Sequence, residues 1–146
     1  MTGFTGRMRE VVDELEGTRK LLFDSVLSLP QASLDFPPSA DRWSLGEILH
    51  HLRLLEDGAV RVTAPASVAP QKGISARELL EGLAGSRALF MKALEKCARF
   101  DFTEVRFPHP VLGNLNGYQW ALYVAKHEER HRRQIEKVKA LRADPS

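Results

Sequence analysis

The stretch WALYVAKHEERHRRQIEKV, residues 120–138, decides the fold class of this 146-residue chain. Its apolar side chains recur every three or four positions, which is the spacing of one face of an α-helix. Charged side chains occupy the other faces, so the stretch predicts an amphipathic helix with one buried side. The row expected to be buried consists of Trp120, Val124, His127, His131, Ile135 and Val138.

Three more stretches show the same helical period, over about residues 5–29, 44–62 and 75–99, and the quoted helix extends over about 116–141. Three of the four predicted helices open on a polar residue followed three positions later by Glu or Gln, a pattern that caps a helix N-terminus. These pairs are Ser44 with Glu47, Ser75 with Glu78, and Asn116 with Gln119.

Two longer segments separate these helices. Residues 31–42 contain Pro37 and Pro38, which oppose a helix, and are predicted to be a loop. Residues 100–115 mix prolines with β-branched and aromatic residues, which predicts a structured loop with room for a short extended piece. The pattern therefore predicts an all-α, four-helix bundle with longer crossover loops, formed as a single domain by residues 1–146.

Composition narrows the classes of partner. The 21 basic and 19 acidic side chains give a net charge of +2, which does not favour nucleic acid as a partner. Glutamates lie among the basic residues of 130–142, a mixture that is typical of a solvent-exposed helix face. Arg7, Arg9 and Glu10 stand where a signal peptide would need its apolar stretch, and no apolar run approaches about 18 residues, so neither a signal peptide nor a membrane partner is expected. Cys97 is the only cysteine and is expected to be a core thiol, which suits a reducing compartment, so the protein is predicted to be cytoplasmic. The balanced charge favours a small molecule as its partner.

Three histidines fall on rows expected to be buried. His127 and His131 lie one helical turn apart, a spacing that lets two ring nitrogens reach one ion. His51 lies on or beside the apolar row of its helix, whereas His50 shares a mixed face. Burying an imidazole without a hydrogen-bond partner costs on the order of 1 to 3 kcal/mol. A shared metal ion would explain all three, although separate bonds to carbonyls or carboxylates are the alternative.

These residues also carry a family resemblance. WSLGEILHHL, residues 43–52, resembles the second-helix motif of DinB-like proteins, in which the metal histidine stands eight positions after a tryptophan; His51 fits this spacing and His50 does not. HPVLG at 109–113, Gln119-Trp120 and HEERHRRQI at 127–135 resemble the fourth-helix region of the same family. The chain thus resembles the DinB-like (DinB/YfiT) metalloprotein superfamily from about Val11 to Leu141.

This resemblance implies an up-down-down-up bundle in which His51, His127 and His131 bind one divalent metal ion, with open positions for water or substrate. Three imidazoles without a thiolate suit zinc, nickel, iron(II) or copper(II), and zinc is the expected ion. The resemblance to this family also suggests that the protein forms a homodimer.

Two classes of function follow. The first is a metal-dependent enzyme that activates a water or a low-molecular-weight thiol, because some members of the family resemble bacillithiol S-transferases and others resemble metal-dependent hydrolases. The second is a non-catalytic, metal-binding stress-response module.

Three residues are candidates for further roles at the site. His127-Glu128-x-x-His131 also satisfies a zinc-peptidase pattern, but no Gly-x-x-His follows it; Glu128 remains a candidate general base, or else a solvated or outer carboxylate. Gln134 could bond a ligand ring or a bound substrate, and His109 could contact substrate at the mouth of the cleft; a surface role and a structural loop role are the alternatives. Trp43 and Trp120 are expected to pack in the core.

Overall fold

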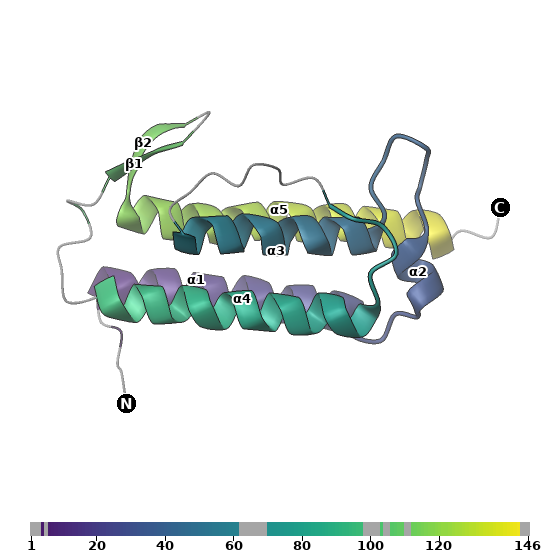
Figure 1. Ribbon diagram of the computed structural model, residues 1–146, viewed down its shortest axis with the longest axis horizontal. Helices are drawn as coiled ribbons and strands as arrows, with labels where there is room; N and C mark the ends of the chain where they lie inside the picture. The colour runs from purple at the N-terminus through teal and green to yellow at the C-terminus, as the bar shows by residue number, and fades with distance from the viewer. Residues whose placement is uncertain are drawn as a thin grey trace.

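The computed structural model describes residues 4, 6–61, 70–97, 103, 106–109 and 112–143. Four long helices form a bundle, in which α1 packs along α5 and α3 packs along α4 (Figure 1). Helices α1 and α5 run in one direction and α3 and α4 in the opposite one, which confirms the predicted up-down-down-up arrangement. Their bounds are α1 Gly6–Val26, α3 Leu45–Arg61, α4 Ala76–Cys97 and α5 Gly117–Ala143.

The predicted caps explain where these helices begin. The Ser44 N–H donates to Glu47 Oε1 at 3.1 Å, and the Glu47 N–H donates to Ser44 Oγ at 3.2 Å. Asn116 and Gln119 exchange the same pair of bonds, both at 2.8 Å. Such boxes satisfy backbone N–H groups that have no partner within the helix. The starts of α3 and α5, and with them the faces that carry the histidines, are thus fixed locally.

The two connecting segments are more structured than predicted. Residues 31–42 include a short helix, α2 Gln31–Asp35, which follows Pro30 and buries Leu34, so the prediction of a loop throughout was wrong. Strands β1 Arg106–His109 and β2 Gly113–Asn116 pair as an antiparallel hairpin directly before α5. The short extended piece predicted in residues 100–115 is therefore a hairpin, and Gly113, the first residue of β2, has a φ of +80°, which favours glycine.

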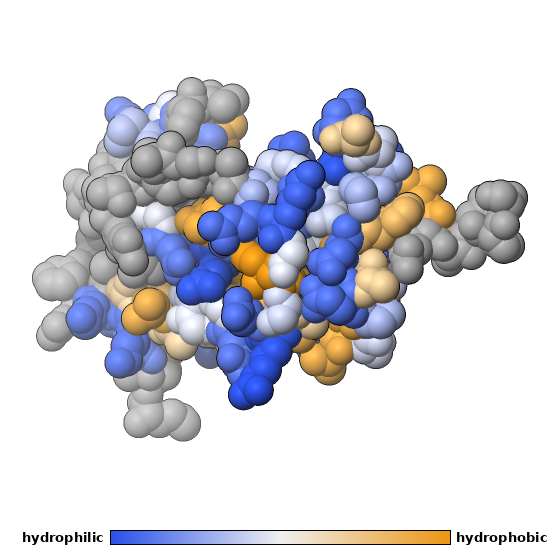
Figure 2. All heavy atoms as spheres, turned by 45° about the vertical axis from the view of Figure 1, so that its right-hand side comes forward, coloured by the Kyte–Doolittle hydropathy of each residue, from blue (hydrophilic) through white to orange (hydrophobic). Residues whose placement is uncertain are grey.

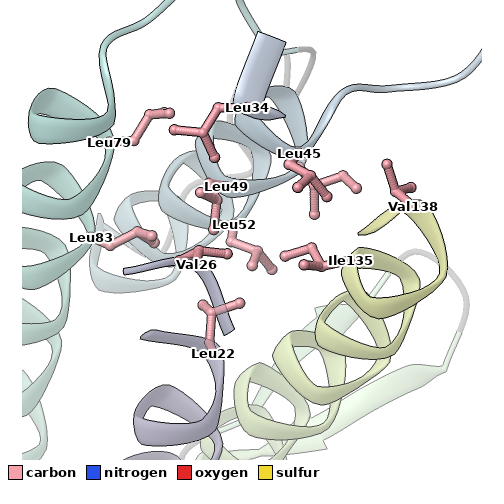
Figure 3. Close-up of a cluster of buried hydrophobic side chains, with 11 residues drawn as sticks. Leu22, Val26, Leu34, Leu45, Leu49, Leu52, Leu79, Leu83, Ile135 and Val138 are labelled. Carbon is pink, nitrogen blue, oxygen red and sulfur yellow. The ribbon is translucent and has the colours of Figure 1, made fainter. Parts of the chain in front are cut away.

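Apolar side chains form two clusters along the bundle. The cluster in Figure 3 lies where α2 meets the long helices, and Leu22, Leu49, Leu83 and Ile135 contribute to it from α1, α3, α4 and α5. The second cluster, nearer the N-terminus of α5, includes Val12, Leu15, Phe90, Val124 and Ala125. The side chain of Cys97, predicted to be a core thiol, lies outside the described residues.

A layer of buried charges separates these clusters along the helices. Arg19 donates to Glu128 Oε1 at 2.8 Å and to Glu56 Oε1 at 3.1 Å. Arg87 donates to Glu56 Oε2 at 2.6 Å and to Glu128 Oε1 at 3.0 Å. Each long helix supplies one member, and the two positive charges balance the two negative ones. Because every carboxylate has guanidinium partners, the layer can be buried without an unpaired charge.

Figure 2 shows a face on which hydrophilic side chains surround small, separate hydrophobic patches. Among the described helices, none combines the length and the apolar character needed to span a membrane.

Candidate metal centre

The structure brings His51, His127 and His131 together between α3 and α5. His127 Nε2 lies 3.4 Å from His51 Nε2 and 3.2 Å from His131 Nε2. One ring nitrogen of each residue lies within 4.8 Å of the others, so the group could hold a metal ion. His51 and His131 are buried and His127 is half-buried. The helical faces chosen from the sequence therefore meet at one point.

Two of the three separations between these nitrogens match a metal site, and the third is within 4.8 Å. Two nitrogens about 2.1 Å from one zinc ion at the tetrahedral angle are about 3.4 Å apart. The 3.4 Å and 3.2 Å separations are close to that value. The donor set, three imidazoles without a thiolate or carboxylate, suits a divalent transition metal of borderline softness.

A hydrogen bond fixes the tautomer of His131. Its Nδ1 lies 2.7 Å from Gln134 Oε1, and since a carbonyl oxygen can only accept, Nδ1 is the donor. The lone pair of a neutral His131 then resides on Nε2, which faces His127. Gln134, predicted to contact a ligand ring or substrate, thus lies against a ligand ring, one turn beyond His131.

Electrostatics keep the two α5 histidines neutral. Burial, followed by the neighbouring His131 and His51, lowers the pKa of His127 to about 3. Burial also lowers the pKa of His131, partly opposed by the bond to Gln134. His127 Nδ1 is buried without a hydrogen-bond partner in the described part of the chain. Neutral imidazole is the form that binds a metal.

Two aromatic residues that the sequence did not assign to the site frame the triad. The Trp43 ring centroid lies 4.8 Å from that of His51, and the Tyr123 centroid lies 5.5 Å from that of His127. Trp43 packs beside the apolar core as predicted, yet it also lines the cavity in front of the histidines. Tyr123 could have been found because it precedes His127 by one helical turn.

His109 is not part of the triad and contacts Tyr123 and Trp120 instead. Its ring centroid is 4.5 Å from that of Tyr123 and 5.3 Å from that of Trp120, and its Nδ1 accepts a bond from the Leu112 N–H at 3.0 Å. Tyr123 stands between it and His127. The structure thus places His109 where the hairpin packs on α5, in contact with Tyr123, and not among the residues that line the cavity.

Glu128 does not join the histidines. It follows His127 in the chain but belongs to the buried charge layer, where its side chain accepts bonds from Arg19 and Arg87 and is only 3% exposed. The expectation that it acts as a base at the site is not supported by this position, and it is not solvated either. His50 is half-buried and accepts the Gln71 N–H at 2.9 Å, a structural contact outside the triad.

A cavity of about 670 Å³ opens onto the three histidines. Trp43 and Gln134 line it together with four basic residues, Arg42, Arg130, Arg133 and Lys137. This volume is in the range of pockets that bind small molecules. The site therefore combines a possible metal-binding triad with space for a ligand.

Comparisons with known proteins agree with this arrangement. Residues 14–135 match the family model of the DinB superfamily. The chain is 25% identical, over 146 aligned positions, to an uncharacterized protein, YuaE, of Bacillus subtilis (strain 168), covering 80% of this chain and 90% of that one. It also resembles the crystal structure of TT2238, described as a four-helix bundle protein, with a TM-score of 0.67 and 26% identity, covering 94% of this chain and 99% of that one.

Proposed function

Because the chain belongs to the DinB superfamily, we propose that it is a divalent-metal-dependent enzyme that acts on a small molecule. The observation that carries this proposal is the convergence of His51, His127 and His131 at the wall of an open cavity. Zinc is the first candidate ion, with nickel and iron(II) as the others.

An open site favours catalysis over a purely structural role. Structural zinc sites normally have four protein ligands, whereas catalytic sites keep three and leave a position open. This triad offers three, and the cavity gives a ligand access to them. A bound divalent ion would supply Lewis-acid chemistry, lowering the pKa of a water or thiol ligand.

The chain's own residues prepare the site. Gln134 accepts the His131 Nδ1–H and so directs Nε2 of that ring toward the other two histidines. Trp43 packs against His51 and walls the cavity. With no carboxylate lining the cavity among the described residues, a general base from the protein is not part of the proposal.

The proposed reaction is either transfer of a low-molecular-weight thiol to an electrophile or hydrolysis. Both use a nucleophile that is weak at neutral pH until its proton is removed. The second candidate function is a non-catalytic, metal-binding stress-response module, in which the ion stabilises the contact between α3 and α5. In that case the cavity would have no substrate.

Activity with and without metal separates these candidates. Purified protein, loaded with zinc, nickel or iron(II) or treated with chelator, would be assayed for thiol consumption with a chlorinated aromatic electrophile and for hydrolysis of activated esters. The enzyme predicts turnover that requires metal, is lost in His131→Ala and persists in the matched control His50→Ala. Absence of turnover across thiols, esters and metals would favour the module.

A further inference from the structure

The cavity in front of the histidines has a strongly one-sided charge. Four basic side chains line it and no carboxylate from the described part of the chain does, whereas the whole chain carries a net charge of only +2. Arg130, Arg133 and Lys137 come from one side of α5, and Arg42 comes from the segment before α3. The positive charge is therefore concentrated by the fold, from two separate parts of the chain.

Three of these cations lack an ion-pair partner. In the described ranges, no carboxylate lies within ion-pair distance of Arg42, Arg130 or Lys137. Arg133 is 3.4 Å from Glu129, a carboxylate that Arg132 already holds at 2.7 Å. Some other surface cations are paired, since Lys20, Arg77 and Lys126 each contact a carboxylate at 2.7 to 3.0 Å. Cations such as Lys72 and Lys92 also have no carboxylate within ion-pair distance among the described residues, so what distinguishes the cavity is that three such cations line one concave site beside the histidines.

We propose that the cavity binds a small organic anion, with carboxylate or phosphate groups held by Arg42, Arg130 and Lys137 and the remainder of the molecule facing the three histidines. Guanidinium groups can bind such anions through two parallel hydrogen bonds, and lysine adds a point charge. This inference rests on the proposed function, whose substrate class it names. The anion-binding residues are distinct from the triad and act with or without a bound metal.

A macromolecular polyanion fits less well. Recognition of a nucleic acid backbone needs a continuous basic surface. The other basic residues nearby are neutralised, because Arg132 pairs with Glu129 and Lys139 bonds the Ser25 carbonyl oxygen at 2.8 Å and lies 3.6 Å from Glu136. Among the described residues of this region, the unpaired cations are therefore confined to a cavity whose volume suits a small molecule.

The test compares a dianion with an uncharged analogue of the same shape. Metal-free protein in a Trp120→Phe background retains Trp43, which lines the cavity, as its only indole, because the chain has two tryptophans. Its fluorescence would be followed during titration with succinate and, separately, with succinamide. We expect saturable binding of succinate that weakens with added salt and is at least about fivefold tighter than binding of succinamide.

Variants of the proposed anion-binding residues test whether succinate binds in the cavity. Arg130→Gln and Lys137→Gln should each weaken succinate binding by about fivefold at low salt. Lys92→Gln, which removes the charge of another exposed side chain, on α4, should leave succinate binding unchanged. Equal affinity for succinate and succinamide, or equal weakening by Lys92→Gln, would overturn the inference. Tight binding of a short oligonucleotide with no binding of succinate would overturn it in favour of nucleic acid.

The same preparations separate this inference from the proposed function. Failure to bind metal, with succinate preference intact, would refute the metal-dependent enzyme and leave the anion site standing. Metal binding without a preference for succinate would refute the anion site and leave the metal-dependent enzyme standing.

Discussion

Gln134 Oε1 lies 2.7 Å from Nδ1 of His131, and this bond turns the Nε2 of the ring toward His127. A residue placed one turn along the same helix thus sets the direction of a candidate ligand. Partners of this kind also raise the basicity of a ligating imidazole.

Gln134→Leu should weaken zinc binding. Removing the acceptor frees the His131 ring to rotate and to change tautomer, and loss of such a partner typically costs about 10-fold to 100-fold in metal affinity. The affinity would be measured by competition with a chromophoric chelator. Gln134→Glu keeps an acceptor at the same position and should retain most of the affinity. Wild-type affinity in Gln134→Leu would show that the bond does not orient a ligand.

The buried charge layer should dominate the effect of arginine substitutions on stability. Arg87→Ala leaves Glu56 and Glu128 with fewer partners in the interior, where removing one member of a buried pair costs about 3 to 5 kcal/mol. Arg77→Ala, which breaks the exposed pair with Glu81, should cost less than about 1 kcal/mol. Urea unfolding gives the free energy of unfolding for both variants. Equal losses would contradict the paired role of the layer.

Stability of the metal-free protein should fall in mild acid. The pKa of His127 is about 3 in the folded chain, against about 6.5 for an unperturbed histidine. Between these values the unfolded chain binds the extra proton, so the free energy of unfolding decreases as the pH drops below 6.5. Urea unfolding of chelator-treated protein at pH 7 and pH 5 should show a smaller loss for His127→Gln than for wild type. The same loss in both would show that His127 is not held neutral by the fold.

Much of the fold was accessible from the sequence because its determinants are local. Helical periodicity and the boxes at Ser44 and Asn116 predicted the long helices to within a few residues. The short helix α2 and the pairing of β1 with β2 were not predicted in that form. Five residues give little periodicity, and strand pairing depends on contacts that the order of residues does not specify.

The site was accessible only where residues share a helix or a motif. The faces of α3 and α5 predicted which three histidines meet. Glu128 was misplaced because its partners, Arg19 and Arg87, lie on other helices, 109 and 41 positions away. A signal did exist, since Arg19 stands on the apolar row between Leu15 and Leu22, where an unpaired charge would be costly.

Metal stoichiometry tests the central claim most directly. Wild type, His51→Ala, His127→Ala, His131→Ala and the control His50→Ala would be incubated with zinc, freed of excess by gel filtration and examined by elemental analysis, with circular dichroism to verify the helical fold. We predict about one equivalent of zinc in wild type and in His50→Ala, and far less in each of the three other folded variants. A full equivalent retained by those three variants, or no zinc in folded wild type, would contradict the metal centre.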